Sequence, residues 1–261
     1  MGKLALAALI GALFELDNFS IGMFLISQPI ITGAAAGYMM GDIQTGIMIG
    51  CLVQLIWANT PPFGAYVPPS SSAIAFITTA LIIIIKNNAP EIAVPSSLMM
   101  FCLVAGVAIG FFVGQMDIWN RKLNVSILHK FENKIREGKG IYILAVNFFA
   151  VTAKLARDFL LYFFILTSAV PLIMRMYKTL PGEIAEALKI SWWIMPVLGF
   201  AVVFDMFRTK QGAVIHGITL FVSYMVFSFY KVNFVFFLLA LFVIGIFTVY
   251  NSVWEKNEAA S

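Results

Sequence analysis

The chain has 261 residues, of which 61% are hydrophobic and 11% charged, against about 25% charged residues in ordinary soluble domains. Together with a mean hydropathy of +0.93, this composition excludes a soluble domain and indicates an integral membrane protein. The net charge of +4 could suggest a nucleic-acid partner, but six of the seventeen basic residues lie between residues 117 and 140, and such clustering in a membrane protein indicates orientation instead.

The apolar segments are long and continuous, whereas the strands of a membrane barrel alternate apolar and polar residues over about ten positions. The sequence therefore predicts an all-α fold, a polytopic integral membrane helix bundle with re-entrant or broken helices. Cys51 and Cys102 both lie in apolar runs, where a thiol behaves as a small hydrophobic group. We expect neither a disulfide nor a redox role.

The chain begins with Lys3 and the apolar residues 4–14, which resemble the start of a signal peptide but lack its cleavage pattern. At about 1.5 Å per residue, this segment covers roughly half of a ~30 Å hydrocarbon core. A short, partly inserted helix is expected. Glu15 and Asp17 follow it, and we expect them at the membrane interface, with a cavity position as the alternative.

Residues 20–40 form the first long apolar segment, which Gln28 and Pro29 interrupt. Glycines then recur every fourth residue and share one helix face, where the missing Cβ atoms let a second helix approach closely. The same spacing returns later in the chain. The two glycine sets are Gly33, Gly37 and Gly41, and Gly106, Gly110 and Gly114.

Two polar residues mark the next apolar run. Asp42 follows a glycine and precedes the run, so it is either the N-cap of a helix or a substrate or proton contact. Gln54 lies within the run, where a carboxamide makes either an interhelical hydrogen bond or hydrogen bonds with sugar hydroxyls. The sequence leaves both alternatives open for each residue.

Four prolines between residues 61 and 69 exclude a continuous helix there. Backbone groups at membrane depth must be paired, so this turn has to face protein or a water-filled cavity, and its apolar flanks favour a re-entrant turn. Ser70 or Ser71 would cap the helix that follows. The polar side chains of the whole stretch form the candidate substrate-binding set: Gln28, Asp42, Gln54, Asn59, Tyr66, Ser70 and Ser71.

After a further span at 92–116, residues 117–140 carry six basic and three acidic residues. The positive-inside rule places this basic segment in the cytoplasm, as a solvated helix and topology signal or as a docking site for soluble proteins. Seventeen of the 25 Phe residues follow residue 116, whereas twelve of the 19 Gly residues precede it. We therefore expect three regions: a Gly-rich transport core at 1–116, a cytoplasmic basic loop at 117–140 and a Phe-rich membrane scaffold at 141–261.

The spans expected in the scaffold are 141–156, 159–176, 190–207, 211–229 and 233–250. Lys154, Arg157 and Asp158 lie between the first two spans. Because charges at that depth are costly unless paired, we expect a salt bridge or an interfacial position. Asp205 and Arg208 are also expected to pair.

The stretch QPIITGAAAGYMMGDIQTGIMIGCLVQLIWANTPPFGAYVPPSSS resembles the signature region of the IIC membrane subunit of the mannose-family sugar phosphotransferase system. The residues in register are Pro29, Gly37, Gly41, Asp42, Thr45, Gly46, Gly50, Gly64 and Pro69. Two positions depart from the family pattern, because Gln54 stands where members often carry Glu and Ser70 where they often carry Asp. Both changes remove a negative charge and keep hydrogen-bonding capacity, which disfavours a cationic amino sugar.

The resemblance implies a multi-pass protein of the bacterial cytoplasmic membrane that translocates a hexose together with a IID membrane subunit. It also implies soluble IIA and IIB phosphocarriers, and we expect a homo-oligomer of IIC–IID units in the lipid bilayer. The alternative is a degenerate, non-transporting structural or regulatory subunit. No activated nucleophile, metal cluster or tuned acid–base pair is legible in the sequence, so we expect no enzyme activity, no catalytic residue, no metal and no cofactor.

Overall fold

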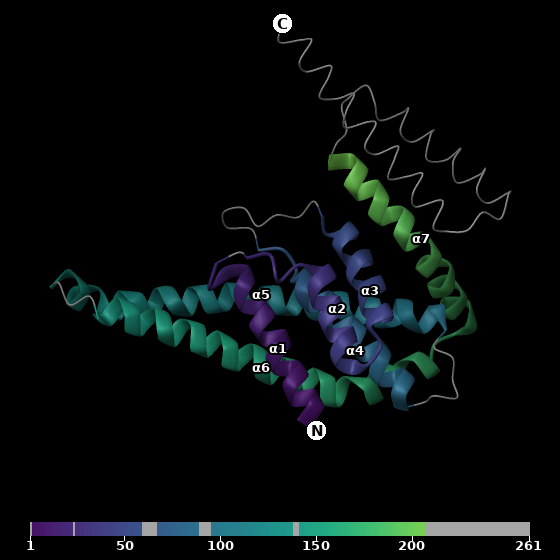
Figure 1. The fold of residues 1–261 in the computed structure, drawn as a ribbon, viewed down its shortest axis with the longest axis horizontal. Coiled ribbons are helices and arrows are strands. Elements are labelled where there is room, and N and C mark those ends of the chain that lie inside the picture. The colour runs from purple at the N-terminus through teal and green to yellow at the C-terminus, as the bar shows by residue number, and fades with distance from the viewer. Residues whose placement is uncertain (1, 23, 59–66, 89–94, 138–140, 207–261) are drawn as a thin grey trace, which may run out of the picture. The chain divides into compact units, whose positions relative to one another are not determined.

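The computed structural model describes the chain except residues 1, 23, 59–66, 89–94, 138–140 and 207–261. The described residues form α-helices and contain no strand, which confirms the all-α prediction. The helices, labelled in Figure 1, are α1 (Gly2–Phe19), α2 (Pro29–Met40), α3 (Ile43–Ile56), α4 (Ser71–Asn88), α5 (Ser96–Arg136), α6 (Ile141–Lys178) and α7 (Gly182–Met206).

Helix α4 is the centre of the core. Every residue from Ser72 to Ile83 is buried, and α4 packs against α1, α2, α3, α5 and α6. A helix that is apolar on all sides suits such a position, because it has no face that needs water. The polar stretch expected to bind substrate therefore leads directly into the most buried helix of the described residues.

Helices α2 and α3 form a close antiparallel pair because glycines line both sides of their contact. A Cβ atom on Gly33 would lie 2.7 Å from the carbonyl oxygen of Gly46, and one on Gly50 would lie 2.7 Å from that of Pro29. Gly41 ends α2 with φ +92°, a left-handed conformation that favours glycine. The predicted close packing of this glycine set is confirmed for Gly33 and Gly37, whereas Gly41 serves the turn.

The second glycine set brings α5 onto α4. Side chains of Thr78 and Ile74 occupy the space beside Gly106 and Gly110. A Cβ atom on Gly114 would lie 2.9 Å from the carbonyl oxygen of Pro68, in the segment that enters α4. The spacing predicted this close approach correctly.

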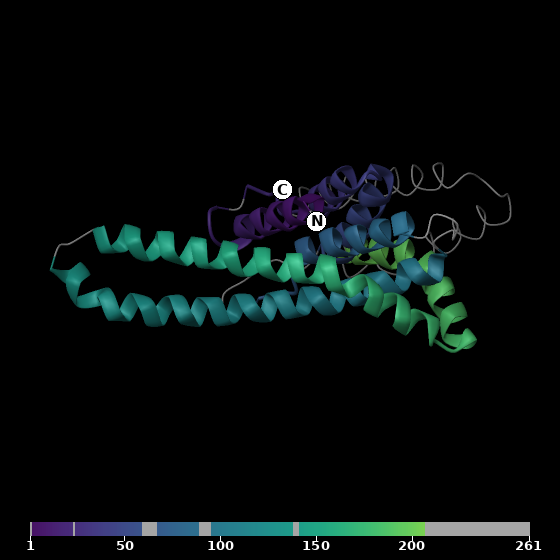
Figure 2. The ribbon, with the colours of Figure 1, turned by 90° about the horizontal axis from the view of Figure 1, so that it is seen from below.

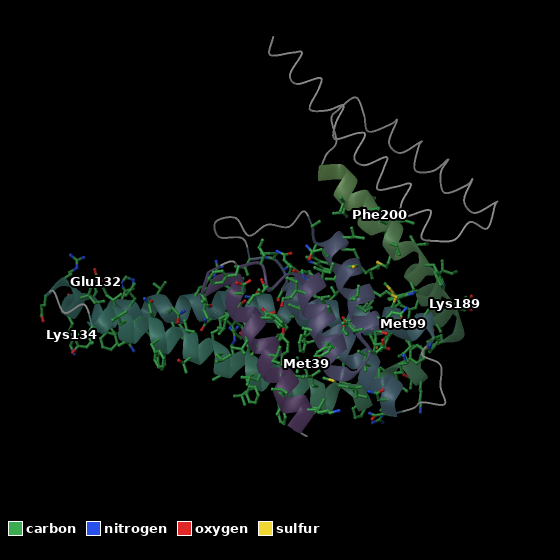
Figure 3. The ribbon with its side chains drawn as sticks, in the orientation of Figure 1. Met39, Met99, Glu132, Lys134, Lys189 and Phe200 are labelled. Carbon is green, nitrogen blue, oxygen red and sulfur yellow. The ribbon has the colours of Figure 1, made fainter. Side chains whose placement is uncertain are left out.

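Helices α5 and α6 contain 41 and 38 residues, and at 1.5 Å per residue each is roughly 60 Å long, about twice a hydrocarbon core. Figures 1 and 2 both show them side by side. In Figure 3, Glu132 and Lys134 lie near the end of α5 that is remote from Met39 and Met99, both of which pack against the core.

The structure corrects several predicted boundaries. Residues 117–136, expected as a basic segment outside the membrane, are helical and continue α5 without a break. The two spans expected at 141–156 and 159–176 are one helix, because the charges between them are paired inside the protein and need no break. The segment at 20–40 becomes helical only at Pro29, which takes the first helical position.

At the two ends of the described chain, helices are longer than their apolar runs. Helix α1 extends from Gly2 to Phe19, beyond the expected residues 4–14, and α7 begins at Gly182, eight residues before the expected span at 190. The acidic residues Glu15 and Asp17 are thereby included in α1. Hydropathy underestimates the lengths of α1 and α7, because both helices continue through polar residues that lie beyond their apolar runs.

Four of the described helices, α4 to α7, are long and apolar enough to cross a membrane. The chain divides into two compact units, residues 1–199 and 200–261. The described part of the second unit is the end of α7. The spans predicted at 211–229 and 233–250, the pair Asp205–Arg208 and the turn at 59–66 lie wholly or partly outside the described residues.

The α2–α3 contact generates a first prediction. In Gly46→Ala, the new Cβ atom would lie 2.8 Å from the Cα atom of Gly37, which is part of the backbone of α2 and cannot move aside cheaply. Overpacking of this kind costs on the order of 1–3 kcal/mol. We expect a lower thermal unfolding midpoint for the detergent-solubilised protein. The matched control is Gly182→Ala, because nothing lies within 4 Å of the added atom; equal midpoints for the two variants would contradict the close packing.

Candidate functional site

The α2–α3 pair brings two of the predicted binding residues together. The Nε2 atom of Gln54 donates a hydrogen bond to the Oε1 atom of Gln28 over 2.8 Å. Gln28 is the N-cap residue of α2 but its side chain makes no capping bond. Its carboxamide is therefore available to reach across to α3.

The contact leaves Gln54 incompletely satisfied. Its Oε1 atom is buried and has no hydrogen-bond partner in the part of the chain that the structure describes. Whichever way the two carboxamides are turned, their single mutual bond leaves a polar atom of Gln54 unused. A buried polar atom without a partner costs about 1–3 kcal/mol, so this position favours a ligand that can supply the missing bond.

Other unpartnered buried atoms in the described residues are less accessible. They belong to side chains that are buried as a whole: Glu15, Ser72, Thr78, Thr79 and Asp117. Gln54 is only half-buried. The Gln28–Gln54 pair is therefore closer to the surface of the described structure than these other atoms.

Asp42 has the geometry of a helix cap. Its Oδ1 atom accepts the Thr45 backbone N–H over 3.1 Å, and its Oδ2 atom accepts the Thr45 hydroxyl and the Lys86 ammonium over 2.9 and 2.6 Å. The hydrogen bond from Lys86, aided by those from Thr45, holds the pKa of Asp42 below its ordinary value. The capping alternative for Asp42 is confirmed, and its carboxylate is occupied by its own chain.

Ser70 likewise has its hydroxyl group engaged. Its Oγ atom donates to Glu15 Oε1 over 2.8 Å and accepts the backbone N–H of Ala73 over 3.1 Å. Its backbone N–H donates to the Gly110 carbonyl over 3.0 Å. Ser70 is thus the predicted N-terminal cap of α4 and also fastens α4 to α1 and α5.

The structure shows little about the other three predicted binding residues. Ser71 is half-buried at the first position of α4. Asn59 and Tyr66 lie outside the described residues. The structure therefore brings together Gln28 and Gln54 from the predicted set, while Asp42 and Ser70 act on the chain itself.

A cluster of buried charges joins α5 to α6. The Lys154 ammonium lies 2.8 Å from Asp117 and 3.1 Å from Asp158, and the Arg157 guanidinium lies 2.6 Å from each of the same two carboxylates. Two cations thus balance two anions across α5 and α6, as charges in an apolar bundle require. The salt bridge predicted for Lys154, Arg157 and Asp158 is confirmed, and Asp117 is an additional member.

Glu15 and Asp17, which were expected at the membrane interface or in a cavity, are both buried in contacts with the protein. Glu15 Oε1 accepts the hydroxyls of Ser70 and of Tyr162, the latter over 3.0 Å. Asp17 accepts two backbone N–H groups of the loop before α2. The sequence signal for these contacts was the presence of two acids near the end of a mainly apolar helix. Such groups need hydrogen-bond partners once the helix packs against the protein.

Metal ligation is not supported by the described geometry. Among the residues described, no group of three His, Cys, Asp or Glu side chains is arranged to hold a metal ion. Cys51 and Cys102 are both free thiols. The chemistry that this site offers is hydrogen bonding by neutral carboxamides.

The matching family model and a similar protein are both described as IIC components. The family model described as the sorbose-specific IIC component of the phosphotransferase system matches residues 1–250. The fructose permease IIC component of Bacillus subtilis (strain 168) is 25% identical over 182 residues, which are 69% of this chain and 63% of that protein. The match thus spans less than two thirds of that relative.

Two solved structures share the fold. One, titled a structure of a membrane protein, has a TM-score of 0.69 at 20% identity and covers 98% of this chain and 96% of that one. The other, the mannose transporter ManYZ in complex with microcin E492, has a TM-score of 0.50 at 22% identity and covers 97% and 93%. These likenesses support a multi-pass membrane fold.

The charge cluster generates the second prediction. In Lys154→Met the two carboxylates keep Arg157 but lose their buried ammonium partner. Breaking a buried pair in this way costs about 3–5 kcal/mol. We expect a large loss of thermal stability in detergent. The control Lys189→Met removes an exposed partner of Glu186 and should change stability little; similar losses in both variants would show that the cluster is not a stabilising centre.

Proposed function

The chain belongs to the family of sorbose-specific IIC components of the sugar phosphotransferase system, and from this premise we propose that it is the subunit that carries a hexose across the membrane. In this proposal the chain forms the sugar pathway together with a IID membrane subunit. Transport is coupled to phosphorylation of the sugar by soluble IIA and IIB proteins. The chain itself provides binding and passage and no phosphorylated residue.

The unsatisfied carboxamide of Gln54 is the observation that carries this proposal. It is a buried polar atom on a half-buried side chain, next to Gln28, in the stretch of the chain that resembles the family signature. Sugar hydroxyls both donate and accept, so they can bond whichever atom the Gln28–Gln54 contact leaves unused. A sugar hydroxyl at this position would supply the hydrogen bond that Gln54 lacks in the empty protein.

The same pair bears on the kind of sugar. Gln28 and Gln54 are neutral, and the one carboxylate of the signature stretch, that of Asp42, is already paired with Lys86. A neutral hexose therefore fits better than a cationic amino sugar. The similar proteins are named for fructose and for mannose, so the family relationship alone does not select one hexose.

The partner proposal is supported by apolar side chains on the α2–α3 pair. Ile31 on α2 and Ile47 on α3 are exposed, as is Tyr38 near the end of α2. In a membrane such side chains face lipid or another subunit. We assign the IID subunit to this side of α2 and α3, because it would then close the half-open carboxamide pair.

The energy source gives the third prediction. Vesicles that contain this chain, its IID subunit and the soluble phosphocarriers should take up labelled hexose only when phosphoenolpyruvate is supplied, and the sugar should appear inside as its phosphate. An imposed ion gradient should not replace phosphoenolpyruvate. Accumulation of unmodified labelled sugar by membranes that hold only this chain would contradict the proposal.

The binding pair gives the fourth prediction. Gln54→Leu removes the open polar atom and leaves Gln28 without its donor. Loss of these bonds should weaken hexose binding by about 10- to 100-fold, from about 1–3 kcal/mol per unsatisfied group. Equilibrium binding of labelled hexose to the purified complex measures this.

A matched control is available on the same helix. Gln44 is exposed on α3, so Gln44→Leu makes the same chemical change away from the pair. Its hexose affinity should equal that of the unaltered complex. An unchanged affinity in Gln54→Leu would remove Gln54 from the binding site.

A further inference from the structure

The last turn of α1 holds the loop that precedes α2. Asp17, which is 3% exposed, accepts the backbone N–H of Phe24 at its Oδ1 atom over 2.7 Å and that of Ser27 at its Oδ2 atom over 3.1 Å. Burial alone would raise the pKa of Asp17, but the N–H groups of Ser27 and Phe24 outweigh it and hold the pKa below its ordinary value. The carboxylate is therefore charged when it binds the loop.

This loop needs such a fixed point because its side chains provide little anchorage. Phe24 and Leu25 are 70% and 60% exposed. Leu25 has φ +67°, a left-handed conformation that is sterically unfavourable for leucine and persists only where its surroundings impose it. The carboxylate of Asp17 bonds backbone on both sides of Leu25 and so imposes that conformation.

The loop ends at Gln28, the residue directly after the held N–H of Ser27. The Gln28 backbone N–H also donates to the Leu25 carbonyl over 3.2 Å. Hydrogen bonds from Asp17 to the loop and within the loop thus fix the backbone position of Gln28. From this position the Gln28 side chain reaches Gln54.

We propose that Asp17 is a positioning residue of the sugar site, which holds the 24–27 loop so that Gln28 meets Gln54 and leaves the Gln54 carboxamide open to ligand. This inference rests on the proposed function, because it assigns a role in sugar binding through the Gln28–Gln54 pair. Asp17 does not itself touch the sugar. Its effect on affinity passes through Gln28.

The charged residues near Asp17 in the structure bond to other parts of the chain. Glu15, two residues earlier on α1, accepts hydroxyls from Ser70 at the start of α4 and from Tyr162 on α6. The ion pairs of Lys154 and Arg157 are made with Asp117 and Asp158. The last turn of α1 therefore fastens both ends of the segment 28–70, with Glu15 at its exit and Asp17 at its entry, and the entry contact can be altered separately.

The first test is a double-mutant cycle in the complex with the IID subunit, with labelled glucose, mannose and fructose as probes. Asp17→Asn should weaken binding of the transported hexose about tenfold. In a Gln28→Ala background the same change should have less than a twofold further effect, because Gln28 no longer transmits it. The control Glu183→Gln alters an exposed acid of α7 and should leave binding unchanged. An equal loss in both backgrounds, or no loss in either, would overturn the inference.

The second test needs no sugar and keeps the inference separate from the proposed function. Hydrogen exchange of the complex should become at least tenfold faster in residues 24–28 of Asp17→Asn, while α4 at residues 71–88 keeps its protection. Unchanged exchange at 24–28, or a loss of protection throughout both segments, would overturn the inference. If none of the three hexoses binds the unaltered complex, the proposed function fails, and the exchange result then decides whether Asp17 holds the loop.

Discussion

The cost of leaving a polar atom without a partner in an apolar interior is the constraint on which this structure depends. Every buried charge of the α5–α6 contact has an opposite charge within 3.1 Å, and the capping side chains Asp42 and Ser70 bond several groups each. Several buried side chains of the described residues keep one polar atom without a partner, and Gln54 differs from the others because its side chain is only half-buried. A binding site for a polar ligand has to keep such an atom open, and it does so at the expense of the stability of the empty protein.

Close backbone packing and polar anchoring have different roles around that atom. Glycines let α2 and α3 approach until backbone meets backbone, which sets the separation between Gln28 and Gln54. The acids of α1 then hold the segments that enter and leave this pair, Asp17 through the loop before α2 and Glu15 through the start of α4. The carboxamides are thus carried by a unit that is fixed at both ends, as binding groups must be if they are to be preorganised.

The sequence predicted much of this arrangement because its strongest signals are local. Glycine spacing predicted the α2–α3 and α4–α5 contacts, Asp42 and Ser70 were recognisable as candidate caps, and a salt bridge was one of the two expectations for Lys154, Arg157 and Asp158. Hydropathy failed where a tertiary partner changes the meaning of a polar residue. It divided α6 at charges that Asp117 neutralises from another helix, and it could not reveal the partners of Glu15 and Asp17, which lie 55 and 7 to 10 residues away in the chain. The unpartnered atom of Gln54 could not be predicted from the sequence, because it depends on the hydrogen bond between Gln54 and Gln28 across two helices.

A map of the complex of this chain with its IID subunit and a bound hexose would test the central claim most directly. The account predicts a sugar hydroxyl within hydrogen-bond distance, about 2.7–3.2 Å, of the Gln54 carboxamide atom that Gln28 does not use. It would be contradicted by a hexose bound elsewhere in the complex while a protein group from the IID subunit saturates Gln54.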